Sequence, residues 1–104
     1  MLVAFSVAPS GGADGSDSVH EAVAAAVRVV RESGLPNHTD SMFTTIEGEW
    51  DEVFAVIKRA TEEVGRFGTR VSLVLKADIR PGRTQELTGK VDRLEAAIRE
   101  AALD

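Results

Sequence analysis

The alternation of apolar and polar residues predicts four strands along the chain. Residues 2–8 are largely apolar on both faces, which is typical of a central strand. Residues 69–80 alternate strictly, which predicts a long strand with one buried face. The residues of that face are Val71, Leu73, Leu75, Ala77 and Ile79. Residues 37–42 and 44–48 alternate less regularly and predict two short strands with a tight bend near Phe43.

Three other stretches carry apolar residues at helical spacing. The first begins at Ser18, which forms an S-x-x-E capping box with Glu21, and it stops at Gly34. Its predicted stripe consists of Val19, Val23, Ala26, Val27 and Val30. The second runs from Trp50 to Phe67, and Trp50 is expected in the core rather than in a ligand wall. After a polar loop at 83–87, the third runs from about 88 to 102; its apolar residues are Val91, Leu94, Ile98 and Leu103.

The resulting order is β-α-β-β-α-β-α in a single domain, residues 1–104. Two β-α-β units with right-handed crossovers predict an α+β fold of the ferredoxin-like plan, an antiparallel βαββαβ sheet with an additional C-terminal helix. We expect the last strand at a sheet edge, where a long unpaired strand invites another subunit. The uncovered sheet face also has apolar content, so we expect a homodimer or homotetramer formed through the sheet edge and the open sheet face.

Composition narrows the functional classes. The chain has 104 residues, a formal charge of −5, no cysteine and two histidines. An acidic balance argues against nucleic acid as a partner, and the missing cysteines exclude disulfides and sulfur-ligated metals. Neither histidine stands at ligand spacing from another, so we expect no metal and no cofactor. No signal peptide or membrane segment is visible, and we expect a cytoplasmic protein.

The candidate chemistry lies in two polar segments. Thr44, Thr45 and Glu47 precede the second helix, and Lys76 and Asp78 end the last long strand. In the predicted topology the stretches 44–49 and 76–80 approach each other across the sheet and line one shared cavity. A flat apolar wall would come from Phe5, Phe43 or Trp50, and Ser6 of the opening strand completes the candidate ligand-binding set.

No phosphate loop and no recognisable catalytic triad is present, so we expect no enzyme. A less favoured hypothesis is an enzyme that uses Glu47 and Asp78 as an acid–base pair, which would require a raised pKa for one carboxyl.

Several blocks together resemble the thiamine-binding-domain family of small bacterial and archaeal proteins. They are the strand ending at Pro9, the helix ending at 29–36, the segment 42–53 with its Thr-x-x-Glu motif, and the segment 76–80 followed by Lys90-Val91. The resemblance implies dimers that assemble into tetramers and a pocket for thiamine or its hydroxymethylpyrimidine moiety. Phe43 stands where the family pattern suggests glycine, and Ile79 where it suggests a second acidic residue.

The leading hypothesis is therefore a non-enzymatic carrier or sensor that binds thiamine or a related pyrimidine. Glu47 and the hydroxyls of Thr44 and Thr45 would pair with an aminopyrimidine, and an acidic or aromatic neighbour would face the thiazolium cation. The alternative is a regulatory module resembling amino-acid-sensing domains, which acts through a protein partner and binds its ligand between subunits near the Gly11–Gly15 loop.

Overall fold

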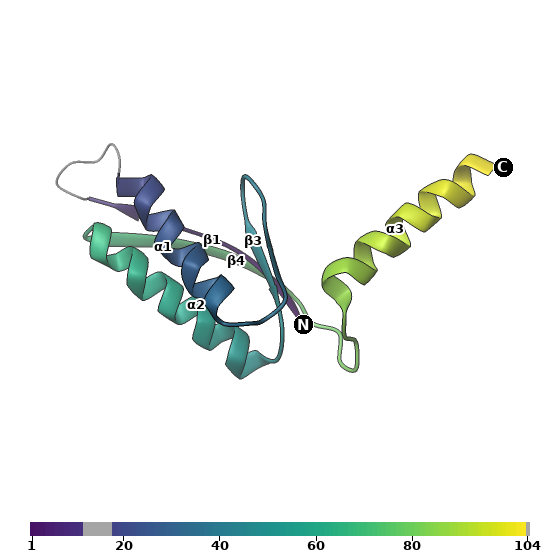
Figure 1. The fold of residues 1–104 in the computed structure, drawn as a ribbon, viewed down its shortest axis with the longest axis horizontal. Helices are drawn as coiled ribbons and strands as arrows, with labels where there is room; N and C mark the ends of the chain where they lie inside the picture. Colours follow the sequence, from purple (N-terminus) through teal and green to yellow (C-terminus); the bar gives the residue numbers. More distant parts are fainter. Residues whose placement is uncertain (12–17, 104) are drawn as a thin grey trace.

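A computed structural model describes residues 1–11 and 18–103 and has the predicted α+β architecture (Figure 1). In chain order its elements are β1 (Leu2–Ser10), α1 (Ser18–Glu32), β2 (Asn37–Thr39), β3 (Thr44–Glu47), α2 (Trp50–Val64), the 3-10 turn η1 (Gly65–Phe67), β4 (Arg70–Asp78) and α3 (Glu86–Leu103). The four strands form one antiparallel sheet in the order β2-β3-β1-β4. The ferredoxin-like prediction with an extra C-terminal helix is confirmed, and β4 lies at a sheet edge as expected.

Strand β1 is the centre of this sheet. It pairs with β4 over all nine of its residues but with β3 only from Leu2 to Phe5. Its alternate residues Val3, Phe5 and Val7 are buried beneath α1 and α2, which cover one face of the sheet (Figure 1). The predicted central strand is thus confirmed, and it continues two residues beyond the predicted end.

The buried stripe of α1 differs from the predicted one. Ala22, Ala26 and Val30 are buried, whereas Val19 and Val23 are 44% and 40% exposed. The small alanines let α1 approach the sheet closely, and the valines are turned toward its flank. The helix begins at Ser18 as predicted; the Ser18 side chain of the predicted capping box lies outside the described part of the chain.

The bend between β2 and β3 is longer than predicted and covers residues 40–43. The Asp40 carboxylate accepts hydrogen bonds from the backbone N–H groups of Met42 (2.8 Å) and Phe43 (2.9 Å), while the Asp40 N–H donates to the Phe43 carbonyl (2.9 Å). An aspartate that binds the backbone two residues ahead closes a turn of this kind. Both strands therefore end earlier than the alternation suggested.

Two predictions of burial are wrong. Leu73 and Leu75 of β4 face the helix side of the sheet, yet they are 39% and 38% exposed, because the two helices cover β1 and leave the edge strand uncovered. Trp50 is 54% exposed, because it is the first residue of α2 and lies beyond the sheet that the helix covers. Val53, Ile57 and Val64 of the second predicted helix are buried as its helical spacing predicted, whereas Phe54 and Phe67 are half-buried.

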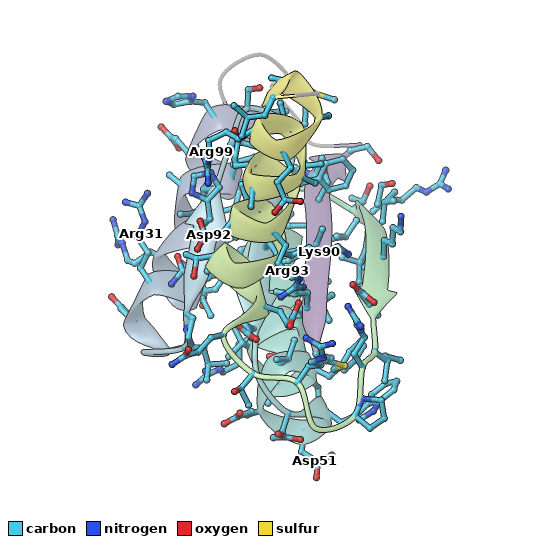
Figure 2. The ribbon with its side chains drawn as sticks, turned by 90° about the vertical axis from the view of Figure 1, so that its right-hand side faces the viewer. Arg31, Asp51, Lys90, Asp92, Arg93 and Arg99 are labelled. Atoms are coloured by element: carbon cyan, nitrogen blue, oxygen red, sulfur yellow. The ribbon has the colours of Figure 1, made fainter. Side chains whose placement is uncertain are left out.

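Helix α3 projects away from the rest of the molecule (Figure 1). The radius of gyration is 16.2 Å, compared with roughly 13 Å for a compact domain of this length. Its apolar residues Val91, Leu94 and Ile98 are each more than half exposed. Figure 2 views the molecule from the side of α3 and places Lys90 toward β4, with Asp92 and Arg99 on the opposite side of the helix. Within the described residues, no helix has the length and apolar character needed to cross a bilayer.

Candidate functional site

A cavity of 190 Å³ lies between α1, the second half of β1 and the β2–β3 bend. Its lining residues are Phe5, Ser6, Val7, Ala8, Val23, Ala26, Val27, Thr39, Asp40, Ser41, Met42, Phe43 and Thr44. The walls are therefore apolar on the α1 side and rich in hydroxyl groups on the side of the bend. This mixture of an apolar body and a few polar groups is typical of small-molecule sites.

The cavity exists because β3 is shorter than β1. Pairing between them stops at Phe5 and Thr44, and the chain then turns away through residues 40–43. The edge of β1 beyond Phe5 has no paired strand on this side among the described residues. The space that a longer β3 would fill remains open, with α1 above it.

The threonine hydroxyls of the β2–β3 hairpin supply a donor to this cavity. Thr39 and Thr44 are cross-strand partners, and their Oγ1 atoms lie 3.2 Å apart, so one hydroxyl donates to the other. Each hydroxyl has one hydrogen and two lone pairs. The pair therefore keeps one hydrogen and several lone pairs for a ligand. Thr44 is only 6% exposed, so the residues packed around it hold its side chain in place.

Asp40 brings a negative charge to the same cavity. Its carboxylate accepts hydrogen bonds from the backbone N–H groups of Met42 and Phe43. These hydrogen bonds hold the pKa of the carboxyl below the ordinary value of 3.8. The carboxylate is thus ionised at neutral pH. Sequence reasoning missed Asp40, although an aspartate followed two residues later by a turn was the signal that could have found it.

The seven predicted ligand-binding residues fall into two groups. Phe43 and Thr44 line the cavity with their side chains, and Ser6 borders it at the exposed edge of β1. Thr45, Glu47, Lys76 and Asp78 lie on the opposite, open face of the sheet, because each is in register with Ala4 or Leu2. The stretches 44–49 and 76–80 do share a cavity at their ends, where Gly48 and Glu49 meet Ile79 and Arg80, but none of the seven predicted ligand-binding residues lines it.

Glu47 and Asp78 do approach each other, on either side of Leu2, but helix α3 contacts both. Glu47 is 7% exposed, and its two carboxylate oxygens accept the backbone N–H groups of Glu86 (2.7 Å) and Leu87 (3.1 Å). These are free donors of the first turn of α3, so Glu47 caps this helix from another element. This cap explains why α3 begins at Glu86, two residues earlier than predicted.

One ion pair supports the same attachment: Lys90 of α3 donates to Asp78 of β4 (2.5 Å). Within α3 itself, Arg93 donates to Glu86 (2.6 Å). These hydrogen bonds are the main cause that holds the pKa of Asp78 below 3.8 and that of Glu86 below 4.5. Glu47 and Asp78 of this open face thus both contact α3.

The site offers hydrogen-bonding groups and a single carboxylate rather than a metal cluster. Within residues 1–11 and 18–103, no three histidine, aspartate or glutamate side chains gather as metal ligands would. The Gly11–Gly15 loop, where the regulatory alternative placed its ligand, lies almost wholly outside the described residues.

Comparison with known proteins places the chain in a family. The family model described as thiamine-binding protein matches residues 3–95, which is most of the chain. The chain belongs to the thiamine-binding protein family. It is 55% identical to the UPF0045 protein Mb1933 of Mycobacterium bovis over 96 residues, which cover 91% of each chain.

Solved structures from the same comparison have the same fold. A Bacillus cereus domain of unknown function, DUF77, is 31% identical with a TM-score of 0.72 and covers 82% of each chain. A proposed thiamine biosynthesis or salvage protein of Thermotoga maritima is 26% identical with a TM-score of 0.73, covering 89% of this chain and 96% of the other. These similarities support the recognition of the family from sequence.

Replacing Glu47 by glutamine should loosen α3. The amide keeps one acceptor oxygen but loses the charge, so one of the two backbone N–H groups loses its partner at a cost of about 1–2 kcal/mol. Amide hydrogen exchange at Leu87 should accelerate accordingly. Glu95→Gln, on the exposed surface of α3, is the matched control and should leave this exchange unchanged. Equal protection in both variants would refute the cap.

The attachment of α3 should also weaken in acid. The Asp78 carboxyl has a lowered pKa in the fold, so its ion pair with Lys90 contributes fully above the ordinary value of 3.8 and is lost as pH falls through the lowered value. Lys90→Met should raise the pKa of Asp78 toward 3.8, measured by NMR titration of the side-chain carboxyl. Arg99→Met, farther along α3, should leave it in place; an unshifted Asp78 in Lys90→Met would contradict the pairing.

Proposed function

We propose that this chain is a non-enzymatic binding protein for thiamine or its hydroxymethylpyrimidine moiety, and that it acts as a carrier or sensor. The observation that carries the proposal is the cavity beside β1, where an ionised carboxylate and a threonine hydroxyl pair meet an apolar wall. Family membership and the name of the Thermotoga maritima relative support it.

The size and polarity of the cavity suit a single pyrimidine ring. Its 190 Å³ lies below the roughly 300–1,000 Å³ of drug-sized sites, so the ring would enter and the rest of thiamine would remain at the rim. An aminopyrimidine carries a donor amine beside acceptor ring nitrogens. The hydroxyls of Thr39 and Thr44 offer both functions, and Phe43 offers a flat face for stacking.

The charge of Asp40 complements the fixed cation of the thiazolium. Asp40 lies in the exposed bend rather than deep in the cavity, which is where the part of thiamine outside the cavity would lie. A carboxylate with a lowered pKa favours a nearby cation and is a poor proton donor. The same reasoning opposes an acid–base pair of Glu47 and Asp78, because the pKa of Asp78 is lowered and Glu47 is engaged by α3.

We further propose that the working form is a homo-oligomer. The partner edge would be β4, which is nine residues long, unpaired on its outer side within the described chain, and carries the exposed residues Leu73, Val74 and Leu75. The exposed stripe of α3 is a second apolar surface, on the open side of the sheet, which Val74 also faces, whereas Leu73 and Leu75 face the helix side. A second copy of the chain would cover both surfaces and remove their apolar residues from water.

Calorimetric titration tests the ligand with two pairs of matched variants. Thr44→Val keeps the shape but removes the cavity hydroxyl, and we expect about a 10-fold weaker affinity for both hydroxymethylpyrimidine and thiamine. Thr45→Val makes the same change one residue away on the open face and should have no effect. Asp40→Asn keeps an acceptor for the bend but loses the charge, so it should lower the affinity for thiamine and leave the affinity for hydroxymethylpyrimidine unchanged. Asp92→Asn is its control and should change neither affinity.

The absence of heat and of a thermal shift with both ligands at millimolar concentration would reject the proposal, because even weak binding raises apparent stability. An equal effect of Thr44→Val and Thr45→Val would instead move the site away from this cavity.

Light scattering tests the oligomer. Val74→Lys places a charge on the exposed face of β4 and should lower the measured mass to that of one chain. Ala24→Lys, on the exposed surface of α1, should leave the mass unchanged. A wild-type chain that is monomeric at high concentration would contradict the proposed assembly.

A further inference from the structure

A second cavity of 190 Å³ lies at the other end of β1, away from the proposed pyrimidine site. It is bounded by the start of α2 and by the turn that follows β4, at residues 79–83. None of its lining residues lines the first cavity. A ligand here would therefore be a separate one.

The turn after β4 brings two arginines to this cavity. Pro81 and Gly82 occupy its middle, Gly82 has a φ of 78°, and the Arg83 N–H donates to the Arg80 carbonyl (3.1 Å). Both guanidinium groups are available. Arg80 forms no ion pair with any other described residue, and Arg83 reaches Glu86 only at 3.7 Å, while that carboxylate is held more closely by Arg93 at 2.6 Å.

Trp50 forms an aromatic wall of the same cavity. Phe54 stacks beneath it, with ring centroids 5.1 Å apart and planes inclined by 16°. This contact fixes the indole ring, although Trp50 as a whole is 54% exposed. Exposing an aromatic face to water is unfavourable, and a flat ring of a ligand could stack on this face without further ordering of the indole.

The charge of this cavity is opposite to that of the chain. Two arginines, Arg80 and Arg83, line it with one acidic residue, Glu49, whereas the whole chain carries a formal charge of −5. The same arginines border Asp78 and Glu86 in an adjoining, much smaller cavity. Guanidinium groups bind phosphate through paired, charge-assisted hydrogen bonds. With two of them, a dianion is favoured over a monoanion such as a simple carboxylate.

We propose that this cavity binds a small phosphate monoester carried on a planar ring. The phosphate group lies between Arg80 and Arg83, and the ring lies against Trp50. This site does not depend on the proposed pyrimidine site and would exist if that one failed.

The sole tryptophan of the chain is in this cavity, so its fluorescence reports binding directly. Three probes separate the two parts of the ligand: phenyl phosphate has both, inorganic phosphate lacks the ring, and phenol lacks the phosphate. Phenyl phosphate should change the fluorescence and bind at least about five times more tightly than inorganic phosphate, because stacking on an aromatic side chain adds about 1–3 kcal/mol. Equal affinity for these two probes, or binding of phenol alone, would overturn the proposal.

Substitutions locate the phosphate. Arg80→Gln and Arg83→Gln should each lower the affinity for phenyl phosphate about 10-fold or more, and Arg80→Lys should retain part of that affinity. Arg28→Gln, on the exposed surface of α1, makes the same change elsewhere and should have no effect. Thr44→Val, in the first cavity, should also have no effect, which separates this result from that of the pyrimidine site. Arginine variants that bind like the wild type would refute the site.

Discussion

Strand β1 is paired unequally on its two sides, and the features of this protein follow from that inequality. β4 pairs with all nine residues of β1, whereas β3 pairs with only the first four. The β4 register places Asp78 beside Leu2, and the short β3 register places Glu47 on its other side. Incomplete pairing on the other side leaves an edge from Ser6 onward, and the first cavity occupies that space under α1.

The open face of the sheet holds helix α3. Two of its polar residues contact this helix, Glu47 by capping it and Asp78 by an ion pair with Lys90. A buried carboxylate without partners would be costly, and the free N–H groups of a helix start are costly in the same way. Each satisfies the other, which fixes where α3 begins and sends its apolar stripe outward, away from the chain's own core.

The two cavities differ in charge although they have the same volume. The first combines hydroxyl groups with an ionised aspartate, which suits a neutral or cationic heterocycle; the second combines two arginines with an indole ring, which suits an anion. They lie toward opposite ends of β1, so one small ligand does not reach both. The two cavities therefore suit ligands of different charge.

The periodicity of the chain determined the α+β class, the order of elements and the apolar stripe of α3, because local alternation and helical spacing are encoded by neighbouring residues. The order of elements in turn predicted that β4 lies at a sheet edge. Phe43 and Thr44, two of the residues predicted from sequence to bind a ligand, line the first cavity. Only the tertiary structure decided which face each polar residue occupies, since a shift of one residue in a strand reverses the face. Thr44 therefore lies in the cavity and Thr45 on the other face, and the geometry of the bend brings Asp40 to the cavity. Glu47 contacts α3 at a residue 39 positions away, which no local pattern of residues could indicate.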